Sequence, residues 1–122
     1  MPRILLIEDD SNVRMLMEHV LLRANYDVDV TSTVEQARAL IEAQAYDLVV
    51  TDGRLPDGTG LTLAELANKQ GIPNLIVTAY AFDLMKEGLG RFEFLLKPVR
   101  PDELLRAVER ALDRAKTRPG RC

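Results

Sequence analysis

Cysteine and tryptophan are nearly missing from this sequence of 122 residues: there is no tryptophan, and the single cysteine, Cys122, is the last residue. One thiol excludes an internal disulfide, and it cannot form a zinc site alone. No apolar run approaches the length of a membrane-spanning helix, and a strand pattern begins directly after Arg3, which leaves no room for a signal-peptide layout. We therefore expect a cytoplasmic protein that does not associate with membranes.

The sequence also has no excess of basic over acidic residues. The formal net charge is -3 and the pI is about 5.2, whereas unassisted binding to nucleic acid needs a basic face that displaces counterions from phosphates. We therefore expect no direct contact with nucleic acid. Hydrophobic residues make up 47% of the chain, which is enough for one compact core. We expect one domain over residues 1–116 and a disordered tail over residues 117–122.

Strand-like and helix-like segments alternate along the chain, which predicts a parallel sheet covered by helices on both faces. Residues 48–50 and 75–77 are continuous apolar runs, typical of strands at the centre of such a sheet. Residues 28–31 alternate apolar and polar side chains, and residues 91–96 do so in part, which indicates edge strands. Right-handed crossovers then favour a doubly wound, five-stranded α/β fold with strand order 2-1-3-4-5.

Helix start signals fall after the first two strands. Ser11 is placed to cap the first helix, and Ser32 with Glu35 forms a capping box for the second. The helical period predicts one buried face on the first helix, formed by Val13, Leu16, Met17, Val20, Leu21 and Ala24.

The second half of the chain has stronger and weaker helix signals. A loop rich in Gly, Pro and Asp over residues 53–60 precedes a helical segment over residues 61–70. Pro101 suits the first position of the last helix. Between these two, residues 79–90 could form only a turn or two, so we expect a fourth helix that is short or irregular.

Polar residues of three chemical kinds stand where four apolar runs end. They are Glu8, Asp9 and Asp10 after the first run, Asp52 after the second, Thr78 after the third and Lys97 after the fourth. If these runs are parallel strands, the polar residues share one edge of the sheet. Ligands of open α/β sheets bind at that edge, outside the carboxyl ends of the strands.

The carboxylates at this edge need a cation, because two of them held about 4 Å apart repel by about 4 kcal/mol at an effective dielectric near 20. Oxygen ligands without nearby histidine or cysteine suit Mg²⁺, with Mn²⁺ as the alternative. Asp52 is the best candidate to receive a phosphoryl group, since an ionised carboxylate needs no general base to attack phosphorus. The Thr78 hydroxyl and the Lys97 ammonium can stabilise charge on the phosphoryl oxygens.

Taken together, these elements resemble the receiver domain of bacterial two-component response regulators, in the same order and over essentially the whole chain. The matching elements are Glu8-Asp9-Asp10, Asp52 with Pro56 and Gly60 after it, Thr78-Ala79, and Lys97-Pro98. The resemblance implies a flavodoxin-like fold and a receiver domain over residues 1–116.

Carried over residue by residue, the resemblance implies a phosphoacceptor and a metal site. Asp52 would accept the phosphoryl group, and Mg²⁺ would be bound by Asp9, Asp52 and the backbone carbonyl of Arg54. Glu8 would act through a metal-bound water. Asp10 is a second-rank site residue that could serve simply as a charge at the start of a helix.

The resemblance also implies how the phosphoryl group is read. Thr78 would hydrogen-bond a phosphoryl oxygen and Lys97 would pair with it, while Phe94 occupies the position of the family's switch aromatic. Pro98 is second rank, and the Lys97-Pro98 peptide is expected to be cis.

The partners implied by the resemblance are a histidine kinase or a histidine phosphotransfer protein as donor, and a downstream partner that the sequence does not identify. A weak homodimer is compatible with it. His19 lies on the polar side of the first predicted helix, so the phosphodonor is expected to be another molecule. The chain would be a phosphorylatable signalling module that assists its own phosphoryl transfer and hydrolysis, rather than an enzyme.

Two other functions compete with this interpretation. A pseudo-receiver is a docking module without phosphorylation, but such a module typically lacks the acceptor, the acidic pair or the lysine, all of which are present here. A phosphatase of the haloacid-dehalogenase type would need a second acid two residues after its nucleophile, where this chain has Arg54. Arg54 is also unusual for a receiver, and we expect this cation to alter the lifetime of a phosphoryl group on Asp52.

Overall fold

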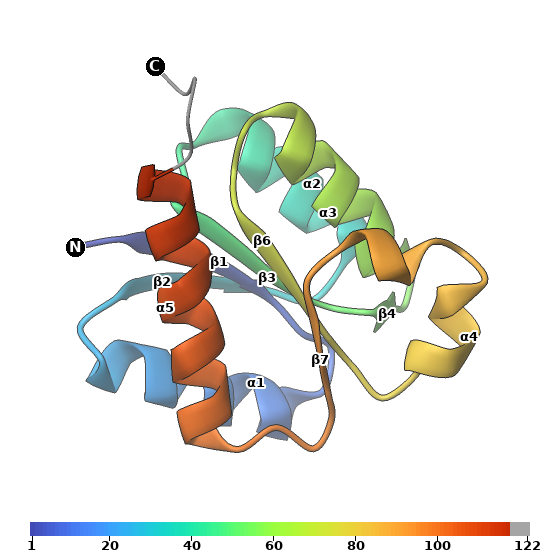
Figure 1. Ribbon diagram of the computed structural model, residues 1–122, viewed down its shortest axis with the longest axis horizontal. Coiled ribbons are helices and arrows are strands. Elements are labelled where there is room, and N and C mark those ends of the chain that lie inside the picture. Colours follow the sequence, from blue (N-terminus) through green and yellow to red (C-terminus); the bar gives the residue numbers. More distant parts are fainter. Residues whose placement is uncertain (118–122) are drawn as a thin grey trace.

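Residues 1–117 are described by the computed structural model, in which a parallel sheet lies between two layers of helices (Figure 1). The five strands run in the order β2-β1-β3-β6-β7 with parallel neighbours, which confirms the predicted order 2-1-3-4-5. The strands are β1 (Arg3–Ile7), β2 (Asp27–Thr31), β3 (Leu48–Asp52), β6 (Asn74–Thr78) and β7 (Phe94–Leu96). The helices are α1 (Ser11–Arg23), α2 (Val34–Ala43), α3 (Gly60–Lys69), α4 (Ala81–Met85) and α5 (Pro101–Thr117).

Alternate side chains of β1 point into two different cores, as the two-residue period of a strand requires. Ile4 and Leu6 pack with residues of α1 and α5, whereas Leu5 and Ile7 pack with residues of α2 and α3. Figure 1 shows the same division, with α1 and α5 on one side of the sheet and α2 and α3 on the other. Continuous apolar strands are therefore required in the centre, because both faces are covered.

The predicted helix caps are each wrong by one residue. Asp10, not Ser11, caps α1: its Oδ1 accepts hydrogen bonds from the amides of Asn12 (2.9 Å) and Val13 (3.1 Å). Thr33, not Ser32, caps α2 by accepting from the Gln36 amide (3.1 Å), so the expected capping box with Glu35 does not form. Adjacent Ser, Thr and Asp residues are near-equal cap formers, and the turn that precedes each helix decides between them.

One residue of the predicted buried face of α1 is exposed. Met17 and Leu21 are buried against the sheet, whereas Leu16 is 54% exposed. Leu16 and Met17 are neighbours in sequence and therefore lie about 100° apart around the helix, so both cannot face the sheet fully.

The segment predicted to be irregular contains a helix of 5 residues, α4, and a single 3-10 turn, Leu89–Arg91. Leu84 and Leu89 are fully buried there and pack with Leu61, Ala64 and Ile76. The 3-10 turn takes up the start of the strand expected over residues 91–96, which begins at Phe94 instead. The edge position of this strand is as predicted.

The loop after β3 contains a two-stranded antiparallel ladder, β4 (Arg54–Leu55) and β5 (Gly58–Thr59), where we expected no regular structure. Helix α5 extends to Thr117, and the rest of the predicted tail, residues 118–122, lies outside the described residues. No helix within residues 1–117 is long and apolar enough to cross a membrane.

Candidate functional site

Three acidic side chains meet at the carboxyl edge of the sheet. Glu8 and Asp9 follow β1, and Asp52 ends β3; these two strands are paired, with Ile7 opposite Thr51. The carboxylate oxygens of the three acids lie within 4.8 Å of one another. Glu8 and Asp52 are buried and Asp9 is exposed, so the cluster has one side open to solvent. The set offers oxygen ligands alone, which fits Mg²⁺.

Lys97 reaches this cluster from the edge strand β7. Its Nζ lies 2.7 Å from Glu8 Oε1 and 3.3 Å from Asp52 Oδ2. The Lys97 amide also donates to the Thr78 carbonyl (2.9 Å), which fixes the backbone beside β6. The Lys97-Pro98 peptide is cis. The ammonium thus sits between two buried carboxylates.

Thr78 lies directly beside the residue that follows Asp52. Its side chain is fully buried, and its Oγ1 accepts a hydrogen bond from the Tyr80 amide (2.9 Å). A Cβ on Gly53 would lie 2.5 Å from this Oγ1, a distance that real contacts do not reach. Glycine at position 53 therefore allows β6 to bring Thr78 close to the loop after Asp52.

The side chains of Phe94 and Asp10 do not take part in the acidic cluster, although the Asp10 amide donates to Glu8 Oε2 (3.2 Å). Phe94 is half-buried and packs against the core cluster that includes Leu84 of α4 and Leu89. Asp10 caps α1, which agrees with its interpretation as a residue at the start of a helix rather than a site residue.

The side chain of Arg54 turns toward α4. Its guanidinium lies 3.9 Å from Asp83 Oδ2, and its Cζ is 5.3 Å from the centre of the Tyr80 ring. The guanidinium of Arg54, two residues after Asp52, is thus held by Tyr80 and Asp83. The prediction from sequence placed this cation beside the site but did not identify either partner.

Sequence reasoning missed Arg14 and Gly53, and it named Gly60 only as part of the matching motif, without a role in shaping the site. Arg14 Nη1 donates to the Glu8 carbonyl (2.8 Å), so α1 helps to hold the first acidic residue. Gly53 and Gly60 provide space: a Cβ on Gly60 would lie 2.1 Å from the Asp52 carbonyl oxygen. Both glycines belong to the segment 53–60 that was predicted as a loop after Asp52, and this composition is the sequence signal that could have identified them.

The charges around the acidic cluster shift two pKa values. Burial, together with the neighbouring Glu8 carboxylate, raises the pKa of Asp52 to about 6, although Lys97 acts in the opposite direction. Burial lowers the pKa of Lys97, but the hydrogen bond to Glu8 and the nearby Asp52 outweigh burial and raise the pKa above its ordinary value. Near pH 7 the site therefore holds an ionised Asp52 and a cationic Lys97.

The raised pKa of Asp52 predicts a pH dependence of stability for the metal-free protein. The pKa of Asp52 is higher in the folded protein than in the unfolded chain, so protonation of Asp52 stabilises the folded state. This stabilisation is complete below about pH 4 and is lost as the pH rises through about 6. We expect the free energy of unfolding to rise by about 1 kcal/mol between pH 7 and pH 5, relative to an Asp52→Asn variant. Urea unfolding with a chelator present measures this. Parallel pH profiles for the two proteins would contradict the assignment.

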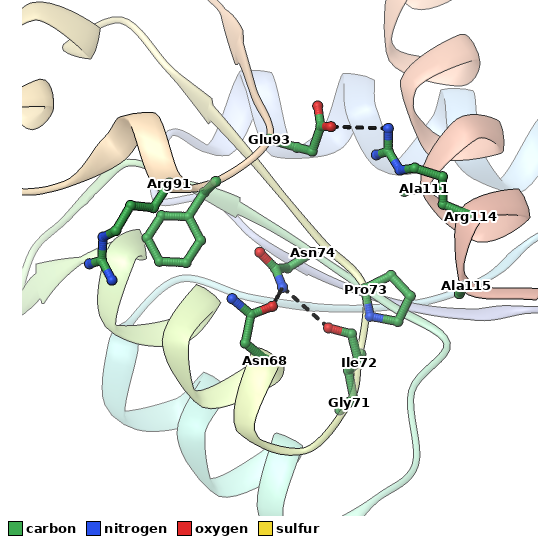
Figure 2. A pocket seen from close by; sticks show the side chains of 11 residues that line it. Asn68, Gly71, Ile72, Pro73, Asn74, Arg91, Glu93, Ala111, Arg114 and Ala115 are labelled. Atoms are coloured by element: carbon green, nitrogen blue, oxygen red, sulfur yellow. Dashed lines mark hydrogen bonds and ion pairs between the residues drawn. The ribbon is translucent and has the colours of Figure 1, made fainter. Parts of the chain in front are cut away.

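A pocket of about 450 Å³ lies elsewhere, near the start of β6 (Figure 2). In it, Asn74 Nδ2 donates to Asn68 Oδ1 (2.7 Å), and Arg114 pairs with Glu93 (3.0 Å). Asn74 begins β6, so the pocket is at the amino end of this strand, opposite to the edge where ligands of parallel sheets bind. None of the predicted site residues lines it.

Comparison with known proteins agrees with this geometry. The family model of the response regulator receiver domain matches residues 4–109. The chain belongs to this family. It is therefore a receiver domain, a signalling module of two-component systems.

Individual relatives of this receiver are similar over nearly its whole length. The response regulator protein PilR of Pseudomonas aeruginosa is 36% identical over 113 residues, which cover 88% of this chain and 25% of PilR. A CheY-like receiver domain protein from Methanospirillum hungatei has a TM-score of 0.87 at 30% identity, with 95% of this chain and 97% of that chain covered. TrrA from Thermotoga maritima, crystallised in complex with Mg²⁺-BeF, has a TM-score of 0.83 at 29% identity, with 92% and 100% covered.

The receiver spans between a quarter and a half of the length of the first curated relatives that it matches. The likeness therefore concerns the receiver part of those proteins. The fold and the acidic cluster agree with that family.

Proposed function

We propose that Asp52 is the phosphoacceptor of this receiver. A carboxylate oxygen of Asp52 would attack the phosphorus atom of a phosphohistidine, the P–N bond would break, and the histidine nitrogen would keep the bonding electron pair. The observation that carries this proposal is the position of Asp52, buried at the end of β3 beside two other acids and Lys97. With a pKa of about 6, Asp52 is mostly ionised at pH 7 and is ready to attack.

A divalent cation is part of this proposal. Asp9, Asp52 and the backbone carbonyl of Arg54 would bind Mg²⁺, or Mn²⁺, and the metal would neutralise charge on the phosphoryl oxygens. The clustering of the carboxylate oxygens supports this set, as does the Mg²⁺-BeF complex of TrrA. Glu8 Oε1 already pairs with Lys97 Nζ at 2.7 Å, which favours contact between Glu8 and the metal through a water.

Thr78, Lys97 and Phe94 would report the phosphoryl group to a partner. The ammonium of Lys97 would move from a carboxylate oxygen of Asp52 to a phosphoryl oxygen. The Thr78 hydroxyl would give up the hydrogen bond that it accepts from the Tyr80 amide and would hydrogen-bond a phosphoryl oxygen instead. Movement of Thr78 would open space beside the half-buried Phe94. Phe94 lies on β7 opposite Ile76 of β6 and packs against the cluster that includes Leu84 of α4, so it would couple the site to the surface around α4.

The partners follow from the family. We propose that a histidine kinase or a histidine phosphotransfer protein supplies the phosphoryl group in the cytoplasm, and that the downstream partner, or a second copy of the receiver in a weak homodimer, contacts the switching surface. The receiver would assist its own phosphoryl transfer, and the aspartyl phosphate would then hydrolyse at the same site: water attacks phosphorus and the Asp52 carboxylate leaves.

Phosphoryl incorporation from a small phosphodonor such as acetyl phosphate tests the proposal. We expect the intact mass to increase by one phosphoryl group when Mg²⁺ is present and to stay unchanged when a chelator replaces it. Equal incorporation with and without the metal would rule out the metal-dependent site.

The contact of Arg54 with α4 predicts an effect on phosphoryl lifetime. Arg54→Ala removes a cation next to the acceptor and frees Asp83 and Tyr80, so water should reach phosphorus more easily. We expect the half-life of the phosphorylated protein to fall two- to fivefold, corresponding to about 1 kcal/mol or less for an exposed charge. Radiolabel decay measures this, and Arg38→Ala, which removes an exposed cation on α2, is the control. Unchanged phosphorylation and decay rates in Arg54→Ala would refute it.

A further inference from the structure

Asp57 joins two parts of the molecule that are distant in sequence. It lies at the tip of the loop between β3 and α3, and its carboxylate accepts from two backbone amides at the start of α2. Oδ1 accepts from the Val34 amide (2.8 Å) and Oδ2 from the Glu35 amide (3.1 Å). The first amides of a helix have no partner within the helix, so this carboxylate fills positions that would otherwise need water.

Helix α2 already has its own cap, because Thr33 Oγ1 accepts from the Gln36 amide. The second cap, from Asp57, therefore adds a link to the loop beyond what the helix normally requires. The hydrogen bonds from both amides lower the pKa of Asp57, with that from Val34 the largest cause, so the carboxylate is ionised throughout the neutral pH range.

The loop itself has little regular structure to hold it in place. Its ladder pairs Arg54 with Thr59 and Leu55 with Gly58, two residues in each strand, and so short a hairpin is not stable by itself in water. Arg54 also contacts Asp83 and Tyr80, but both of these are exposed. Leu55 is buried in the same cluster as Val34, and Asp57 makes the two hydrogen bonds to the start of α2. The position of the loop thus depends in large part on α2.

We propose that Asp57 is a positioning residue for the divalent cation: its link to α2 holds the loop so that the Arg54 carbonyl can serve as a metal ligand. The inference rests on the proposed function, because it assumes a metal at Asp9 and Asp52. Mg²⁺ demands near-ideal octahedral geometry, so a loop that carries one of its ligands must be held closely in place. Asp57 touches no metal ligand; it acts through the hairpin that begins with Arg54.

The test is a titration of Mg²⁺ alone into the metal-free protein, followed by calorimetry or by amide NMR shifts at pH 7. We expect Asp57→Ala to weaken Mg²⁺ binding roughly tenfold, the lower end of what loss of an outer-shell partner costs. Asp57→Asn keeps one acceptor oxygen and should fall between Asp57→Ala and the parent. Hydrogen exchange in the metal-free protein should speed up at residues 54–59 in Asp57→Ala.

Thr33→Ala is the matched control, because it removes the other cap of α2 and leaves the loop link intact. Its Mg²⁺ affinity should equal that of the parent. Equal weakening in Thr33→Ala and Asp57→Ala would overturn the inference, since capping of α2 in general would then explain the effect. A parent-like affinity in Asp57→Ala would overturn it as well.

A second variant keeps the test decisive if Asp57→Ala does not fold. Val34→Pro deletes one donor to Asp57 at the first position of a helix, where proline fits well after the extended Thr33. It should weaken Mg²⁺ binding in the same direction, and parent-like binding would reject the inference. If the parent itself binds no Mg²⁺, the proposed function fails, which is a result distinct from each of these.

Discussion

Replacing Lys97 by methionine is expected to lower the free energy of unfolding of the metal-free protein by about 2 to 3 kcal/mol at pH 7. Lys97 Nζ contacts the carboxylates of Glu8 and Asp52, which are 1% and 6% exposed. Without the ammonium, two buried acids face each other with no cation in contact. Removal of one partner from a buried ion pair leaves an uncompensated charge, and this costs more than the pair itself contributes.

The loss in Lys97→Met should depend on pH in a defined direction. Lys97 lowers the pKa of Asp52, so its removal raises that pKa above about 6. Protonation of Asp52 then relieves the repulsion, and the difference between variant and parent should shrink at pH 5. Urea unfolding at pH 5 and pH 7 measures this, with Lys69→Met, an exposed cation in the last turn of α3, as control. Equal stability of Lys97→Met and the parent at pH 7 would contradict the account of the site.

Replacing Gly60 by alanine is expected to destabilise the protein by about 3 kcal/mol, the upper end for overpacking. The added Cβ would lie 2.1 Å from the Asp52 carbonyl oxygen and 3.0 Å from the Thr51 side chain. The nearest atom belongs to the backbone, which cannot rotate away as a flexible side chain can. The end of β3 must therefore shift, and Asp52 with it, so phosphoryl incorporation should slow as well.

Gly90→Ala is the matched control for Gly60→Ala. A Cβ on Gly90 meets its nearest neighbour, Met85 Sδ, at 3.6 Å, an ordinary van der Waals distance. Its effect on the free energy of unfolding should stay within about 0.5 kcal/mol. Chemical denaturation compares the two variants, and a Gly60→Ala protein as stable as Gly90→Ala would show that the packing beside Asp52 is looser than the structure indicates.

The strand ends could be predicted from sequence because they rest on local signals. Continuous apolar runs identify β3 and β6 as central strands, and a parallel sheet then brings Asp9 and Asp52 to one edge. The position of Lys97 followed from the same rule, although its closer partner proved to be Glu8. The weak segment 79–90 was also correctly predicted, since it lacks the apolar period of a full helix.

The interactions that sequence did not predict are long-range ones. Asp57 belongs to the segment 53–60 that was predicted only as a loop, yet its carboxylate accepts hydrogen bonds from amides 22 and 23 residues away. Arg54 was expected beside the acceptor, yet its guanidinium pairs with Asp83 on α4. No local pattern encodes such pairs, because they depend on how the loop and the helices are placed by the sheet.

Site-specific phosphorylation tests the central claim most directly. After incubation with Mg²⁺ and a small phosphodonor, peptide mass spectrometry of the parent should place one phosphoryl group on Asp52, and Asp52→Asn should remain unlabelled. Asp10→Asn is the control from the same acidic sequence, since asparagine caps a helix as well as aspartate does. It should be labelled like the parent. Equal labelling of Asp52→Asn and the parent would contradict the account.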